Sequence, residues 1–252
     1  LISSYSYEQQ SYRVGFGSCL NQNKPQEIWN AIKKENIQSF FFLGDNDDGD
    51  DDNEDLKNLK MAYEIQKTKL PNWLNNIEIM SIWDDHDFGK NDAGKDYQLK
   101  EKSKEIFFDF WTSYGAEFNV ENQTYFSKLV EIKSKKILFL GLDTRFYRSK
   151  LIGKSGSYIK NDDNSATILG KDQWFWLENE LSKKVDFIVL GSSIQVLPLD
   201  HGWEKWGNFE NERNRLLKLI KDIDINCLII SGDRHRAGTV SYTHLTLPTI
   251  VR

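Results

Sequence analysis

Short apolar runs alternate with segments of helical periodicity along most of the chain. Runs such as Phe40-Phe41-Phe42-Leu43 are too short for helices and indicate buried strands. The predicted strands cover residues 12–16, 40–43, 77–83, 125–132, 136–142, 187–190 and 225–230. The predicted helices comprise a segment opened by Pro25 and residues 100–111, 172–181 and 212–222, with residues 153–169 as a polar surface loop. This alternation predicts an α/β fold with helices outside one or more sheets.

Composition narrows the class of protein. A chain of 252 residues is long enough for one large domain with a substantial core. Its net charge of −5 argues against a nucleic-acid binder, which would show a basic face. No apolar run approaches the ~20 residues that a membrane span needs. Cys19 and Cys227 are too few for a disulfide scaffold, so we expect stability to come from a packed core.

Four of the predicted strands end in reactive polar residues. The segments are Gly17-Ser18-Cys19, Gly44-Asp45-Asn46, Asp84-Asp85-His86-Asp87 and Gly232-Asp233-Arg234-His235. In α/β sheets, ligands gather beyond the carboxyl ends of the strands, so we expect the four loops to converge on one site. Carboxylates, imidazoles and a thiolate are the donors of metal sites. The pattern therefore predicts a metal centre.

Each of these residues also has a purely structural interpretation. Cys19 is explained equally well as a buried apolar side chain, and Asp45 as a turn or helix-capping residue. Asp233 next to His235 would simply fix the tautomer of the imidazole. A thiol hydrolase using Cys19 and His86 is a further alternative, although nothing in that chemistry explains so many carboxylates around a thiolate.

Residues 45–55 form an acidic run, with eight Asp or Glu in eleven positions. The run fails the calcium-loop template in the registers starting at Asp45 and Asp48, which put a glycine or an asparagine at the wrong positions. Beyond Asp50 we interpret it as a solvated surface loop.

The motifs resemble those of the PhoD-like (alkaline phosphatase D) members of the calcineurin-like metallophosphoesterases, from Gly17 to about Gly238. Besides the four segments above, the resemblance includes Asn91-Asp92-Ala93-Gly94, Leu142-Asp143-Thr144-Arg145 and Gln173-Trp174 with Trp176-Leu177. It implies a four-layer α/β/β/α sandwich with a dinuclear metal site that hydrolyses phosphomonoesters or phosphodiesters. The implied cofactors are iron with calcium or another divalent cation, and the implied partner is a small phosphate ester.

Carried over to this sequence, the resemblance implies a role for each site residue. Cys19 would be a thiolate ligand and Asp45 the bridging carboxylate, while Asp85, together with Asp84, would hold the second metal. Asp233 and His235 would close the metal shell. The implied catalytic residues are His86 beside the leaving group, with Asn91 and Arg145 as contacts to phosphate.

The sequence departs from the family pattern in two places. Asp48 occupies the position where the family usually has a tyrosine whose phenolate binds iron, and we expect Asp48 to serve there as an oxygen ligand. The family also continues well beyond the Ser-Gly-Asp-x-His strand, so we expect a truncated domain over residues 1–241. Residues 242–252 resemble a translated sequencing adapter and are interpreted as a non-native tail, which leaves open a weak or inactive metal-binding protein of the same fold.

Overall fold

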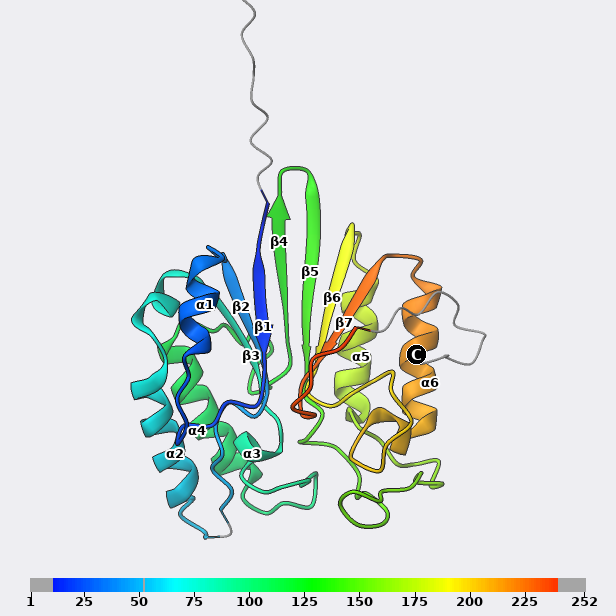
Figure 1. Ribbon diagram of the computed structural model, residues 1–252. Coiled ribbons are helices and arrows are strands. Elements are labelled where there is room, and N and C mark those ends of the chain that lie inside the picture. The colour runs from blue at the N-terminus through cyan, green and yellow to red at the C-terminus, as the bar shows by residue number, and fades with distance from the viewer. Residues whose placement is uncertain (1–10, 52, 240–252) are drawn as a thin grey trace, which may run out of the picture.

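Two β-sheets form the centre of the computed structural model, which describes residues 11–51 and 53–239 (Figure 1). The first sheet is parallel, with the order β1 (Val14–Gly17), β2 (Ser39–Leu43) and β3 (Glu78–Ile82). The second has the order β4 (Phe126–Ile132), β5 (Lys135–Leu142), β6 (Phe187–Ser192) and β7 (Cys227–Ser231). Only β4, which forms a hairpin with β5, runs antiparallel to its neighbour.

The helices lie on the outer sides of the two sheets. Next to the first sheet are α1 (Ile28–Lys34), α2 (Lys57–Lys69) and α4 (Lys100–Ser113); next to the second are α5 (Gly170–Leu181) and α6 (Glu210–Asp222). The short α3 (Asp85–Phe88) directly follows β3, and two 3₁₀ turns cover Asn72–Asn76 and Trp206–Asn208. Among the described residues, no helix is both long and apolar enough to cross a membrane.

The alternation of side chains along β2 explains why this strand is apolar throughout. Phe40 and Phe42 pack with Trp29 of α1 in the cluster that faces the helices. Phe41 and Leu43 belong to the cluster between the two sheets, together with residues of the second sheet such as Phe139 and Val189. Because a parallel strand between two layers is covered on both faces, its sequence shows no polar alternation. A third cluster packs α5 and α6 against the second sheet.

The sequence predictions of an α/β fold and of the strands agree with this architecture. Helix α2 was not predicted, although Leu59, Ala62, Tyr63 and Gln66 have helical spacing and are buried. Two expectations of solvent exposure are wrong. Ile168 and Leu169, at the end of the expected surface loop, are fully buried. Asp51 is buried too, because its carboxylate accepts hydrogen bonds from the backbone N–H groups of Asn53 and Asn58 ahead of α2.

Candidate metal centre

The carboxyl ends of six parallel strands place polar side chains at one end of the two sheets. Cys19 follows β1, Asp45 follows β2, and Asp84 and Asp85 follow β3. The second sheet contributes Arg145 after β5, Ser193 after β6, and Asp233 and His235 after β7. The segments converge because both sheets are fixed against one another by the apolar cluster between them. The four motifs that the sequence singled out thus lie together.

Left-handed backbone marks four of these residues. The φ angles are 59° at Cys19, 50° at Asp45, 64° at Asp233 and 50° at His235. Residues other than glycine rarely adopt this conformation, and it costs on the order of 1–3 kcal/mol where the surroundings enforce it. At Gly44, with φ 93°, a Cβ atom would lie 2.6 Å from the Cβ of Asp84, so only glycine allows β2 and β3 to end so close together.

Asp45 is shared by three overlapping groups of donor atoms. Its partners are Cys19 and His235 in the first group, Asp84 and Asp233 in the second, and Asp85 and His86 in the third. Within each group the donor atoms lie within 4.8 Å of one another. A carboxylate that belongs to three such groups could contribute to more than one cation site.

Two observations bear on whether a metal cation fits between these residues: the types of ligand atom present and two buried oxygens without a partner. Asp84 and Asp233 each have one buried carboxylate oxygen, Oδ2, without a hydrogen-bond partner among the described residues. An unpaired buried carboxylate oxygen is costly, and coordination of a cation would satisfy it. The sulfur and nitrogen of the first group suit a transition metal, whereas the three carboxylates of the second suit a harder cation. The residues therefore fit metal binding.

Burial and mutual repulsion set the pKa values of these acidic groups. Burial, followed by the charges of Asp85 and Asp84, raises the pKa of Asp45 well above its ordinary value. Burial raises the pKa of Asp233 to about 7, and Asp85 adds to that shift. Burial likewise raises the pKa of the Cys19 thiol, so without a metal this cysteine is mainly the neutral thiol.

The pKa of Asp85 shifts in the opposite direction because Arg145 lies near it. Burial alone raises its pKa, but the positive charges of Arg145 and His86 and a hydrogen bond from the backbone N–H of Asp92 lower it to about 2. Asp85 is therefore a carboxylate throughout the physiological pH range.

His86 lies at the edge of the cluster with acidic residues on both sides. Its Nδ1 is 2.9 Å from an oxygen of Asp50 and 3.7 Å from one of Asp48. Burial alone lowers the pKa of His86, but the hydrogen bond to Asp50 and the charges of Asp85, Asp50 and Asp48 raise it to about 10. In the metal-free protein the ring is thus an imidazolium that faces the cluster.

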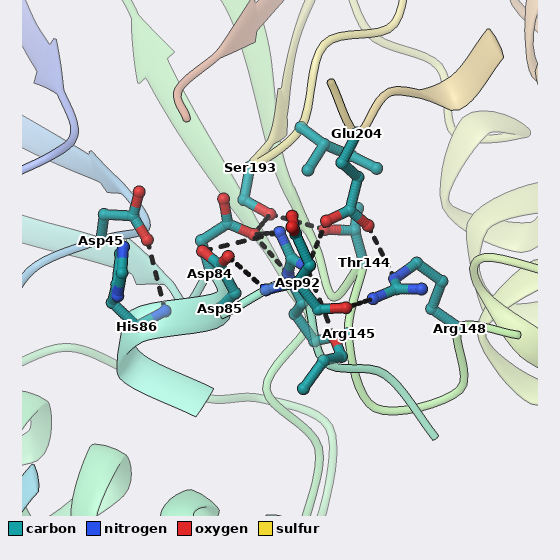
Figure 2. A network of polar contacts seen from close by, with 12 residues as sticks. Asp45, Asp84, Asp85, His86, Asp92, Thr144, Arg145, Arg148, Ser193 and Glu204 are labelled. Carbon is teal, nitrogen blue, oxygen red and sulfur yellow. Dashed lines mark hydrogen bonds and ion pairs between the residues drawn. The ribbon is translucent and has the colours of Figure 1, made fainter. Parts of the chain in front are cut away.

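A buried network of ion pairs joins the two halves of the site (Figure 2). Arg145 Nε donates to Asp84 Oδ1 at 2.5 Å, and its Nη1 donates to Glu204 Oε2 at 2.6 Å. The same Glu204 binds Arg148 Nε at 2.7 Å. Ser193 also donates to Asp84 Oδ1, at 2.8 Å. The network holds Asp84 from the side opposite to its unpaired oxygen.

Two of the predicted site residues, Arg145 and Asp48, have other contacts than those expected, and a third, Asn91, is exposed. Arg145 is fully buried, and its hydrogen bonds go to Asp84, Glu204 and the carbonyl of Ala93, so here it orients carboxylates instead of facing a phosphate. The side chain of Asp48 is about half exposed (48%) and accepts a hydrogen bond from Asn21, and it belongs to none of the three donor groups.

Sequence reasoning missed Glu204, Arg148 and Ser193 altogether. Glu204 and Arg148 lie in irregular segments, where nothing in the local pattern distinguishes them. Ser193 directly follows β6, so the strand-end rule that identified the other candidates could have found it. Asp87 is different, because it lies inside a motif that was identified. It accepts hydrogen bonds from the backbone N–H groups of Asp84 and Asn46, and so ties the end of β2 to the end of β3.

The raised pKa values predict how the metal-free protein responds to pH. Burial raises the pKa of Asp233 to about 7 and that of Asp87 to about 6, both above the unfolded value of about 4. These groups bind more protons in the folded state, so folding is favoured at low pH and loses that stabilisation as pH rises through 6 and 7. The raised pKa of His86 acts in the same direction.

We therefore expect the metal-stripped protein to have a free energy of unfolding at least about 1 kcal/mol lower at pH 8 than at pH 5. Urea denaturation at the two pH values measures it. Bound cations should flatten or invert this slope, because they favour the carboxylates. A metal-stripped protein that is equally stable at both pH values would show that these carboxyls are not buried together.

Comparisons with known proteins agree with the chemistry of the site. Residues 135–248 match the PhoD-like phosphatase family. A comparison with curated protein sequences gives no match. Among solved structures, one described as the structure of PhoD is similar to 88% of this chain, with a TM-score of 0.66 and 19% sequence identity. A second, described as GAP50, the anchor in the inner membrane complex of Plasmodium, also covers 88%, with a TM-score of 0.50 and 13% identity.

The chain spans 51% of the PhoD chain and 65% of the GAP50 chain. At these identities the structural matches establish the fold alone, and the family model matches residues 135–248. The PhoD-like family suggests a hydrolase that acts on phosphate esters. Together, the family match and the fold shared with PhoD support the assignment of this chain to the PhoD-like phosphatases.

Proposed function

We propose that the chain is a metal-dependent phosphoesterase with a dinuclear site built around Asp45. The observation that carries the proposal is the sharing of Asp45 among three donor groups, two of which contain ligands from both sheets. On this proposal Cys19 and His235 hold an iron or similar transition metal, and Asp84, Asp85 and Asp233 hold calcium or another divalent cation. The two sheets and their outer helices would then be a four-layer sandwich of the family type.

On this proposal Asp85, His86 and Arg145 have different roles in the hydrolysis of a phosphate ester. Bound cations would neutralise the phosphate and act as Lewis acids. Asp85, ionised at all relevant pH values, retains its negative charge next to them. The protonated ring of His86 lies between Asp50 and the cluster. From there it can donate its proton to the leaving oxygen of the ester. Arg145 keeps Asp84 oriented and excludes water from its buried side.

The geometry favours this chemistry over a thiol hydrolase. A nucleophilic cysteine needs a lowered pKa, whereas burial raises that of Cys19. The hydrogen-bond partners of the thiol are Ser18, at 3.2 Å, and Asp45, at 3.6 Å. A carboxylate next to a thiolate would destabilise the nucleophile, but a cation between them would stabilise both.

A metal-binding protein of the same fold with weak or no activity is the second candidate. The placement of Asp48 favours it, since its half-exposed side chain is held by Asn21, outside the donor groups. If Asp48 does not take the place of the family's tyrosine, the transition metal lacks one ligand. Asp48 as an oxygen ligand remains part of the proposal.

One experiment distinguishes the candidates. We expect elemental analysis of the purified protein to find bound iron or another transition metal together with a divalent cation. We expect turnover of an aryl phosphate monoester or diester that disappears after metal removal and returns on reconstitution. Bound metal without turnover would support the second candidate, and turnover by the metal-stripped protein would exclude the first.

A further inference from the structure

A cavity of about 260 Å³ opens beside the candidate metal centre. Its inner wall includes Cys19, Asp45, His86 and His235. Its volume lies just below the range of about 300–1,000 Å³ typical of small-molecule pockets, so it suits a small ligand. One end of the cavity thus belongs to the proposed reaction, and the other end is free to contact the remainder of a substrate.

The outer wall comes from the segment between β1 and α1. Leu20, Pro25 and Ile28 give it an apolar surface, and the side chain of Ile28 is 56% exposed although it lies in the first turn of α1. Exposed aliphatic side chains next to a polar centre suit an apolar part of a ligand.

Lys24 is the single lysine or arginine among the residues that line this cavity. It has no ion-pair partner among the described residues, whereas the inner wall carries the carboxylates that we assign to the cations. As a cation, Lys24 has no role in holding metals. Its charge suits a second anionic group on the substrate, one spacer away from the phosphate.

The segment that carries Lys24 is held in place by its own hydrogen bonds. The backbone N–H of Lys24 donates to the carbonyl of Asn21 at 3.1 Å. Gln26 Nε2 donates to Gln66 Oε1 of α2 at 2.8 Å, and Trp29 Nε1 donates to Gln26 Oε1 at 3.0 Å. Because the backbone is fixed before a ligand arrives, ordering Lys24 costs only side-chain entropy.

We infer that the outer end of the cavity selects a leaving group with a short apolar spacer and a second negative charge, which Lys24 binds. This rests on the proposed function, because the phosphate is assigned to the metal end. The substrate class is thus a small phosphate ester of an anionic alcohol or phenol, such as one that carries a carboxylate or a second phosphate.

Matched pairs of compounds test the inference in turnover and in binding. The substrates are phenyl phosphate and 4-carboxyphenyl phosphate, and the uncleavable ligands are phenylphosphonate and 4-phosphonobenzoate, measured by calorimetry on the metal-containing protein. We expect the carboxylated member of each pair to be favoured about five-fold, which is what a well-placed exposed ion pair contributes. Lys24→Met should bring both ratios to about one, and Lys24→Glu should invert them.

Lys34→Met is the control, because Lys34 lies in the last turn of α1, outside the cavity, and should leave the ratios unchanged. If both substrates were turned over equally, and the Lys24 variants did not change this, the inference would be overturned and the proposed function would stay intact. Absence of turnover with a Lys24-dependent preference for 4-phosphonobenzoate would overturn the hydrolysis and leave the binding inference intact. Absence of binding by both phosphonates would overturn the inference.

Discussion

Replacing Asp45 with Asn is expected to lower phosphoesterase activity more than about 100-fold and to reduce the bound metal. The substitution keeps the shape of the side chain but removes the charge shared by three donor groups. Loss of residues that only support a ligand costs about 10–100-fold in metal affinity or activity, so loss of a shared ligand should cost more. Steady-state kinetics and elemental analysis measure the two effects.

The same variant should be more stable than the wild type when both are stripped of metal. Burial and the charges of Asp85 and Asp84 disfavour the ionised form of Asp45, and the neutral amide has no such penalty. Glu54→Gln, on the exposed part of the acidic segment, is the matched control and should change neither property. An Asp45→Asn protein with full metal content would remove Asp45 from the centre of the site.

Replacing Glu204 with Ala is expected to lower the free energy of unfolding by about 3–5 kcal/mol. Glu204 is almost fully buried (2% exposed) and lies within 2.7 Å of a nitrogen of both Arg145 and Arg148. Removing the carboxylate leaves two guanidinium groups buried with too little negative charge, and uncompensated buried charge carries a cost of that size. Urea denaturation measures it.

Two further variants separate this ion-pair effect from a general loss of packing. Glu204→Gln keeps the volume and should still be clearly destabilised. Glu178→Ala removes the exposed partner of Arg215, at 2.6 Å, and should change stability by no more than about 1 kcal/mol. If Glu204→Ala were as mild as Glu178→Ala, the network would not stabilise the fold. We also expect Glu204→Ala to weaken metal binding, because Arg145 then orients Asp84 less firmly.

Much of the metal centre was predictable because parallel strands bring their carboxyl ends to one edge. That rule places Cys19, Asp45 and Asp85 near one another at the end of the first sheet, and Asp233 joins them because the second sheet packs against the first. It says nothing about the loops between strands, and Glu204 came from such a loop. The direction of a side chain is equally hidden, since Arg145 follows a strand end as expected but faces Asp84 and Glu204.

The left-handed backbone conformation of several site residues could not be predicted from sequence patterns either. Glycine signals a left-handed residue, as at Gly44, but Cys19 and His235 adopt the same conformation without any such signal. Helix α2 is a different case. Its apolar spacing was present in the sequence, but no element was predicted for residues 57–69.

Because the candidate ligands come from both sheets, the order in which the ribosome synthesises the chain affects when they can meet. A ribosome produces Cys19, Asp45, Asp84 and Asp85 early, while Asp233 and His235 follow only after β7 has been made. Until then, the nascent chain exposes carboxylates that lack their partners, and pairings between such distant segments form slowly. On the proposed assignment the cation site can be completed only after β7 has been made, and a chain interrupted before β7 would carry an incomplete site however well its first sheet had folded.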